Sequence, residues 1–163
     1  MRKIKIKARK ESVKCSECGK ENALFYLSDF SYGKKLIIYD EGRKYAFINL
    51  FEDDIYKEFE VLINEIMEEN GKIAEDGLIN DLFEITCDPI SKCLIDFRHN
   101  KRKCNYCESY VFDANLLEPE KLVDIEVPIV THEIWERLNS VQKREKIENV
   151  LRSRGILTDF KAV

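Results

Sequence analysis

Two Cys-x-x-Cys pairs, Cys15/Cys18 and Cys104/Cys107, constrain the fold of this chain more than any other feature of its sequence. Two residues between thiolates allow both sulfurs of a pair to approach one ion from a single turn. Two such pairs together supply the four ligands of a tetrahedral thiolate site. The pairs therefore predict a metal cross-link between a turn near the start of the chain and a turn far along it.

The residues around the two pairs resemble the knuckles of the zinc-ribbon superfamily. They read Lys14-Cys15-Ser16-Glu17-Cys18-Gly19-Lys20 and Lys103-Cys104-Asn105-Tyr106-Cys107. The resemblance implies Zn²⁺ as cofactor with the four cysteines as ligands, and iron in a rubredoxin-like cage is the alternative.

The chain departs from a compact ribbon in two ways. The pairs lie farther apart than the roughly 15–20 residues of the usual spacing. In addition, Glu108 follows the second pair where Gly19 follows the first. The intervening residues are then an insertion between ribbon halves, or the site lies on a different fold.

Cys87 and Cys93 have three interpretations. They form a second metal site with His99, to which His132 could contribute, or one of them enters the first site. Alternatively they are buried thiols that behave as small hydrophobic residues. His99, in a basic loop, is otherwise a surface histidine.

Composition predicts a globular protein, because 44% of residues are hydrophobic and 36% are charged. The basic N-terminus is not followed by an apolar segment, and no apolar run approaches 18 residues, so we expect neither a signal peptide nor a membrane span. Cytoplasmic location is then the default. Cysteines in such a chain favour metal ligation or free thiols over disulfides.

Charge is distributed unevenly, although the net charge is only −4. Residues 1–20 and 98–103 are basic, whereas residues 52–76 carry ten acids against Lys57 and Lys72. A metal that joins the two Cys pairs would also bring the two basic clusters together. We therefore expect a positive metal end and a negative helix.

Residue patterns predict an α+β fold. Residues 4–9 alternate as a half-buried strand, and strand-like runs at 23–27, 35–39 and 44–51 predict an antiparallel meander. Apolar residues from Ile55 to Met67 recur at helical spacing, with Asp53 or Asp54 as the N-cap.

The last third of the sequence predicts a helical hairpin. Thr131 and Ser140 are the expected helix caps, and Gly155 the expected end. We expect a metal-stapled domain at 1–128 and this hairpin at 129–163, which could belong to the same domain. Residues 77–85 are ambiguous, 90–97 and 110–112 are weakly strand-like, and Val127-Pro128 marks a loop.

The sequence contains no recognisable catalytic motif. Only two histidines are present, and four thiolates would close the metal to water. We therefore expect a protein that is not an enzyme; the enzymatic alternative would use Cys87 or Cys93 with His99.

Two binding functions remain. The first is a zinc-stabilised protein-interaction module with an unknown protein partner, such as a bacterial regulator, a phage factor or an immunity-type protein. The alternative is nucleic-acid binding through the basic metal end, with Tyr106, Tyr110 or Phe112 stacking on bases. The phosphate contacts would be Lys5, Lys7, Arg9, Arg98, Lys101, Arg102 and Lys103.

Overall fold

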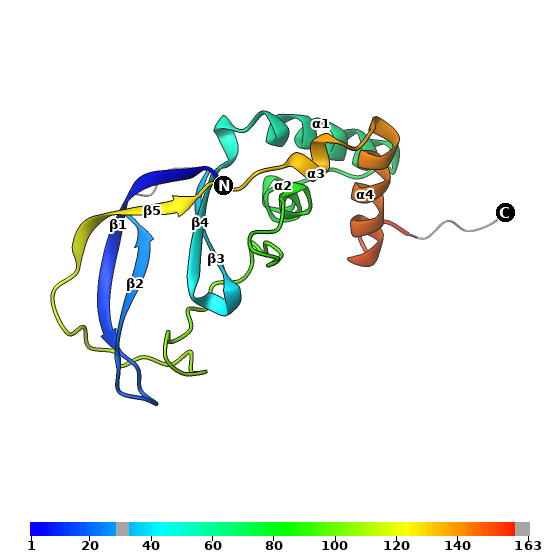
Figure 1. The fold of residues 1–163 in the computed structure, drawn as a ribbon. Coiled ribbons are helices and arrows are strands. Elements are labelled where there is room, and N and C mark those ends of the chain that lie inside the picture. Colours follow the sequence, from blue (N-terminus) through cyan, green and yellow to red (C-terminus); the bar gives the residue numbers. More distant parts are fainter. Residues whose placement is uncertain (29–32, 159–163) are drawn as a thin grey trace. The chain divides into compact units, whose positions relative to one another are not determined.

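The computed structural model describes residues 1–28 and 33–158 of the chain. It confirms a mixed α+β fold with antiparallel strands (Figure 1). Contacts divide the chain into two compact units. The β unit comprises Met1–Leu50 and Pro89–Val130, and the helical unit comprises Phe51–Asp88 and Thr131–Val163. The expected division at residues 128 and 129 stays a prediction, and we describe each unit by itself.

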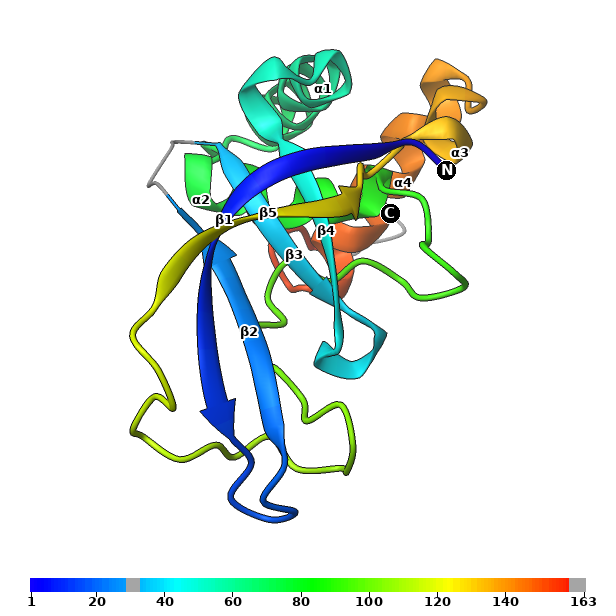
Figure 2. The ribbon, with the colours of Figure 1, turned by 60° about the vertical axis from the view of Figure 1, so that its left-hand side comes forward.

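The first sheet of the β unit has the strand order β2-β1-β5, with both pairings antiparallel. Its strands are β1 (Lys3–Lys14), β2 (Glu21–Leu27) and β5 (Lys121–Pro128). Alternating residues of β1 are exposed lysines, and Ala8 lies on the buried side. Figure 2 shows the long β1–β2 hairpin with β5 along the other edge of β1.

The second sheet pairs β3 (Lys34–Tyr39) with β4 (Lys44–Asn49) in antiparallel register. The short helix η1 (Asp40–Gly42) forms the tip of this hairpin. Buried apolar residues lie on both faces of this hairpin, because consecutive strand residues point to opposite sides. They are Ile37, Ile38, Ala46, Phe47 and Ile48. The predicted strands therefore exist, but they are divided between two sheets.

The sequence prediction missed β5 because Val127-Pro128 indicated a loop. Pro128 is instead the last residue of this edge strand. Its missing N–H is tolerated there, because proline is accepted at edge strands. Conversely, residues 90–97 and 110–112 are not strands. They contribute only isolated bridges between Ile90 and Cys93 and between Cys15 and Phe112.

The helical unit contains four α-helices among the described residues: α1 (Asp54–Glu69), α2 (Asp76–Leu82), α3 (Glu133–Glu136) and α4 (Ser140–Ser153). Two short 3₁₀-helices, η2 (Leu50–Glu52) and η3 (Phe83–Thr86), precede α1 and follow α2. Phe59 packs edge-on against both Phe83 and Trp135, and all three are fully buried. No helix in the described part of the chain is long and apolar enough to cross a membrane.

The cap of α1 was predicted correctly, whereas the caps of α3 and α4 differ from the expected residues. Asp53 caps α1 as predicted, because its carboxylate accepts from the backbone N–H of Ile55 at 2.9 Å. Thr131 does not cap α3; Asp88 does so from another segment, accepting from the N–H groups of Glu133 and Ile134.

Helix α4 likewise begins one residue earlier than expected. Asn139 is its N-cap, not Ser140, and it forms a reciprocal capping box with Gln142. The amide of Asn139 accepts from the N–H of Gln142 at 2.9 Å, and the Gln142 side chain accepts from the N–H of Asn139 at 2.9 Å. Ser140 is therefore already the first helical residue.

A buried histidine joins distant segments of the helical unit. His132 Nε2 lies 2.6 Å from Asp53 Oδ2, and Nδ1 lies 3.0 Å from Thr86 Oγ1. The Thr86 hydroxyl donates to the Phe83 carbonyl, so it accepts from His132. Burial raises the pKa of Asp53, but the hydrogen bond and charge of His132 and the N–H of Ile55 outweigh it, so the pKa is lowered.

We predict that Asp53→Asn destabilises the protein at neutral pH by about 2 kcal/mol, because it replaces the carboxylate in a charge-assisted hydrogen bond. Since the folded-state pKa of Asp53 is depressed, this stabilisation is present above the unfolded pKa and is lost as pH falls through the folded value. Urea denaturation at neutral and acid pH measures the change.

Asp54→Asn is the matched control, because the Asp54 side chain is almost fully exposed. Its free energy of unfolding should stay close to wild type at both pH values. Loss of metal at acid pH affects both variants equally, so their difference isolates Asp53. An equal cost of both substitutions at neutral pH would contradict the role given to the histidine contact.

Candidate metal centre

The four predicted metal ligands meet at one end of the β unit. Cys15 and Cys18 lie in the β1–β2 turn, and Cys104 and Cys107 lie in a loop that precedes β5 (Figure 2). Their four sulfur atoms all lie within 4.8 Å of one another. Among the described residues, this is the one group of three or more Cys, His, Asp or Glu side chains close enough to share a metal ion.

The sulfur separations suit a tetrahedral metal site. Cys15 and Cys107 are 3.6 Å apart at Sγ, as are Cys18 and Cys104. A tetrahedron with metal–sulfur bonds of about 2.3 Å has edges of about 3.8 Å. A disulfide requires about 2.05 Å, and all four thiols are free. The donor set therefore fits one cation.

Both knuckles close through the same backbone contact. The N–H of Cys15 donates to the carbonyl of Lys20 at 2.9 Å, and the N–H of Cys104 donates to that of Ser109 at 2.9 Å. Gly19 adopts a φ of 75°, which a residue without Cβ tolerates best. Glu108, at the equivalent position, has no positive φ, so the second knuckle turns without a glycine.

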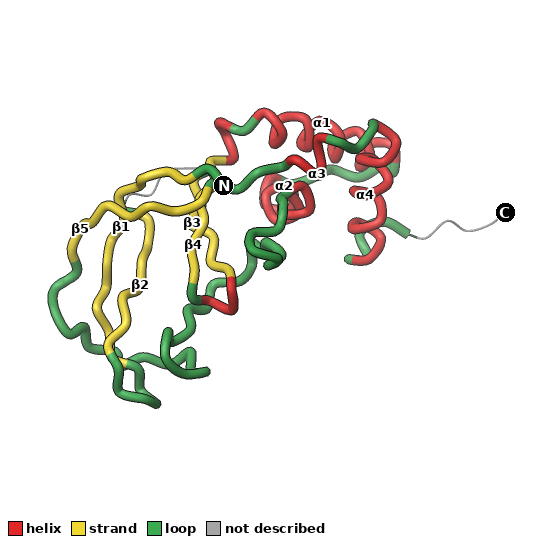
Figure 3. Tube along the Cα trace, in the orientation of Figure 1, coloured by secondary structure: helices red, strands yellow, loops and turns green. Residues whose placement is uncertain are grey.

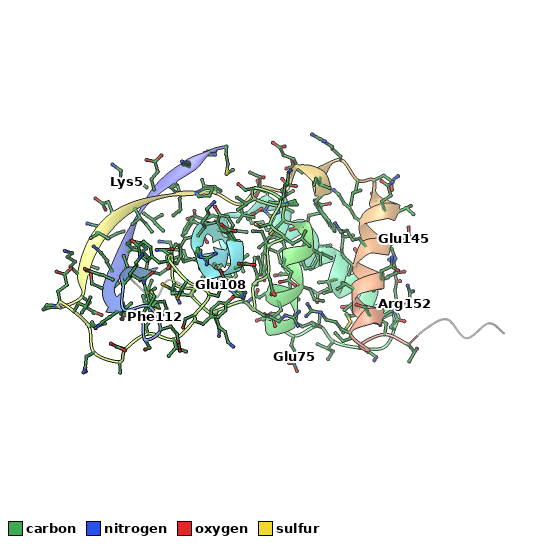
Figure 4. The ribbon with its side chains drawn as sticks, turned by 60° about the horizontal axis from the view of Figure 1, so that its bottom comes forward. Lys5, Glu75, Glu108, Phe112, Glu145 and Arg152 are labelled. Carbon is green, nitrogen blue, oxygen red and sulfur yellow. The ribbon has the colours of Figure 1, made fainter. Side chains whose placement is uncertain are left out.

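The segment after the second knuckle ties it to β1. Ser16 donates its N–H to the Val111 carbonyl at 3.0 Å, and Asp113 donates its N–H to the Lys14 carbonyl at 2.9 Å. The Ser16 hydroxyl also donates to the Asp113 carboxylate at 2.8 Å. Figure 4 places Phe112 beside the end of β1. These contacts hold the two knuckles face to face.

Asn22 connects the two knuckles through one buried amide. Its Nδ2 donates to the Lys20 carbonyl beside the first knuckle at 3.2 Å and to Cys104 Sγ of the second at 3.3 Å, and its Oδ1 accepts the N–H of Asn105 at 2.8 Å. The residue is 3% exposed and faces the same side of β2 as Leu24. Sequence reasoning missed Asn22; a polar residue at an inward position of a strand was the available signal.

The tip of the β3–β4 hairpin supports the second knuckle from the other side. Arg43 donates from Nε to the Cys104 carbonyl at 3.0 Å and from a terminal nitrogen to the Cys107 carbonyl at 3.1 Å. Gly42 has a φ of 102°, and a Cβ there would lie 2.5 Å from the Lys101 oxygen. Neither residue was predicted to be part of the site.

A network of ion pairs surrounds the contact between Arg43 and the second knuckle. Lys103 is 6% exposed; its ammonium lies 3.0 Å from Glu41 and also pairs with Glu108. The guanidinium of Arg43 lies 3.3 Å from Glu108. Hydrogen bonds to Glu108 and Glu41 raise the pKa of Lys103, because the two carboxylates stabilise its charged form. Lys103 therefore holds the knuckle in place.

Hydrogen bonds and crowding affect the thiols in opposite directions. Burial raises the pKa of Cys104, but the N–H of Tyr106 and the amide of Asn22 lower it to about 6. For Cys107, the N–H of Ser109 lowers the pKa, whereas burial and the neighbouring thiols raise it to about 12. Four adjacent thiolates need a cation to balance their charge, which is the condition a bound metal satisfies.

The remaining predicted ligands lie in different units. Cys87 belongs to the helical unit, where burial raises the pKa of its thiol and Sγ donates to the Phe83 carbonyl at 3.8 Å. Cys93 and His99 belong to the β unit and line one small pocket. His132 is held by Asp53 and Thr86. The second metal site stays a prediction.

Comparison of the chain with protein-family models, with curated proteins and with solved structures found no match. The resemblance to zinc ribbons therefore rests on the two knuckles and their geometry. What the structure itself shows is a cluster of four cysteines that could bind a metal ion.

We predict that Asn22→Ala weakens metal affinity by about 10- to 100-fold, the usual effect of removing a group that orients a ligand. The cause is loss of the amide donor to Cys104 and of the acceptor for the Asn105 N–H. Competition with a chromophoric chelator measures the affinity.

Asn105→Ala is the control, because Asn105 contributes its backbone N–H to this contact and not its side chain. The substitution should leave metal affinity within about twofold of wild type, well inside the effect expected for Asn22. Equal affinities of the two variants would show that the Asn22 amide does not position the second knuckle.

Proposed function

We propose that the protein is a non-enzymatic protein-interaction module whose β unit is held together by a structural Zn²⁺ ion. The cluster of four cysteine sulfurs supports this proposal most directly. Four thiolates fill the tetrahedral shell of zinc and leave no position for water or substrate. Neither a histidine nor a carboxylate belongs to the cluster.

The proposed role of the metal follows from the segment that it would hold. Residues 94–120 contain no helix and no strand longer than an isolated bridge (Figure 3). Most side chains from Glu108 to Glu120 are exposed, so burial contributes little to ordering this segment. The binding energy of a structural zinc is also folding energy, and it would offset that entropic cost.

The same segment and the start of β5 expose apolar side chains that could contact a partner. We call these residues the apolar surface: Tyr106, Tyr110, Val111, Leu116, Leu117 and Leu122. Their exposed fractions range from 38% at Leu116 to 61% at Leu122. Aromatic and aliphatic side chains grouped on one exposed segment are typical of protein-binding surfaces. A partner protein with its own apolar contact residues fits this chemistry.

The nucleic-acid alternative has weaker support from the residues it requires. Lys103 is buried in ion pairs, and Arg102 stacks on Tyr26 at 3.8 Å. Lys5 and Lys7 are exposed, and Figure 4 shows Lys5 on the outer side of β1. Each faces an acid on β5: the register pairs Lys5 with Glu126 and Lys7 with Asp124.

The other basic residues do not restore a continuous surface. Arg9 forms an ion pair with Glu120 at 3.4 Å, and Arg98 pairs with Asp96 at 3.8 Å. Lys101 is exposed. Because acids accompany most of these cations, they supply less of the unbalanced positive charge that phosphate contacts need. We therefore keep protein interaction as the proposed function.

Metal content tests the first part of the proposal. We expect about one zinc ion per purified chain by elemental analysis, and none in Cys104→Ser, because the loss of one thiolate opens the tetrahedral shell. Two zinc ions per chain would instead support the second site at Cys87, Cys93 and His99. Iron in place of zinc, or an equal metal content in both proteins, would contradict the proposal.

Capture experiments test the second part. Val111→Asp with Leu122→Asp should abolish the capture of a stoichiometric protein partner from the source cell, because charge disrupts an apolar contact. The control is Ile73→Asp, which changes an 88% exposed residue of the helical unit. The proposal is wrong if both proteins retain or both lose the partner, or if the chain captures nucleic acid alone.

A further inference from the structure

The β unit contains a pocket of about 570 Å³ that is separate from the cysteine cluster. Strands β1, β2 and β3 line it together with residues 96–102. Its volume lies within the range of about 300–1,000 Å³ that is typical of small-ligand sites. No cysteine contributes to its lining. It is therefore a candidate site in its own right.

The lining carries more positive than negative charge. Four cations line the pocket: Arg9, Lys34, Lys35 and Arg102, of which Arg9 is paired with Glu11 and Glu120 outside the lining. Asp96 is the one acid in the lining, and it accepts the N–H of Arg98 at 2.9 Å and pairs with the Arg98 guanidinium. Within residues 1–28 and 33–158, neither Lys34 nor Lys35 takes part in a salt bridge.

Buried polar atoms without partners gather around the same pocket. Arg9 Nε, His99 Nε2 and Arg102 Nε are all buried and have no hydrogen-bond partner. Two other such atoms occur in the described part of the chain, and neither lies at this pocket. A buried donor left unpaired is costly, at about 1–3 kcal/mol. The two arginine Nε groups are donors, and His99 Nε2 is a donor or an acceptor according to its tautomer. Unpaired donors beside a cavity favour a ligand that supplies acceptors.

Aromatic and aliphatic side chains complete the lining. The Arg102 guanidinium lies 3.8 Å from the Tyr26 ring centre, and the Lys35 ammonium lies 5.5 Å from that of Phe97. Leu27 and Leu36 add apolar surface. The pocket thus offers cations beside ring and hydrocarbon surface, which suits a ligand with a charged end and a flat, less polar end.

We propose that this pocket binds a phosphate-bearing ligand of nucleotide size. Lys34 and Lys35 hold the phosphate, and Arg9 and Arg102 add positive charge and hydrogen-bond donors beside it. Phe97, Leu27 and Leu36 contact the flat portion of the ligand. This inference goes beyond the proposed protein interaction, because it uses neither the metal ligands nor the apolar surface.

Titration calorimetry with adenosine monophosphate, adenosine and inorganic phosphate tests the inference on the full chain. We expect the monophosphate to bind at least about tenfold more tightly than adenosine, which lacks the charge that the cations recognise. Lys34→Gln with Lys35→Gln should weaken monophosphate binding by about tenfold or more. Inorganic phosphate should bind more weakly than the monophosphate but should compete with it.

The matched control is Lys5→Gln with Lys7→Gln, which removes the same charge from exposed positions of β1 outside the pocket. It should change the affinity by less than about twofold. Unchanged metal content and circular dichroism show that each variant is folded. Arg9→Gln is the second pocket variant, and it should weaken binding even if the lysine pair does not fold.

Three outcomes would overturn the inference: no binding at about 10 mM monophosphate, equal binding of adenosine, or equal effects of the two lysine pairs. A short 5′-phosphorylated oligonucleotide distinguishes the source of the phosphate. Tighter binding than the mononucleotide assigns the ligand to a strand end, and weaker binding assigns it to a free nucleotide. The result is independent of whether the apolar surface captures a protein.

Discussion

Four thiol groups packed at one end of the β unit set the condition on which its structure depends. Their sulfur atoms lie within 4.8 Å of one another, a spacing at which four negative charges repel strongly unless a cation lies between them. The surrounding structure is arranged to hold this cluster. Asn22 joins one knuckle to the other, and Arg43 holds the carbonyl groups of the second. A metal ion would convert this repulsion into a cross-link between the two knuckles.

The helical unit is held together by an apolar core. Its fully buried aromatic core includes Phe59, Phe83 and Trp135. His132 connects segments that are far apart in sequence through Asp53 and Thr86. The contrast has a physical reason. Helices with wide apolar faces bury enough surface to order themselves, whereas the exposed loops of residues 94–120 bury little. Metal removal should therefore act first on the β unit.

Sequence patterns predicted those features that depend on neighbouring residues. The spacing of apolar residues identified α1, and Asp53 was one of two expected caps. The strands β1 to β4 were expected from alternation and turn residues. Errors occurred where a distant group replaced a local one. Asp88 caps α3 in place of Thr131. A second difference is local: Ser91 and Lys92 adopt positive φ in a tight turn that their residue types do not indicate. The pairing of β5 with β1 also could not be predicted, because it depends on which sheet edge the chain reaches after a long loop.

The sequence by itself determined the donor set: two cysteine pairs whose spacing suits one tetrahedral ion, on a chain with strands and an amphipathic helix. Tertiary structure decided what surrounds that set. It placed Asn22 and Gly42 against the second knuckle, buried Lys103 in ion pairs, and set Arg9, His99 and Arg102 around one pocket. The physical reason is the sequence distance over which each interaction acts. Ligand spacing and helix periodicity are local properties of the chain, whereas burial, ion pairing and the lining of a cavity depend on residues brought together only by folding.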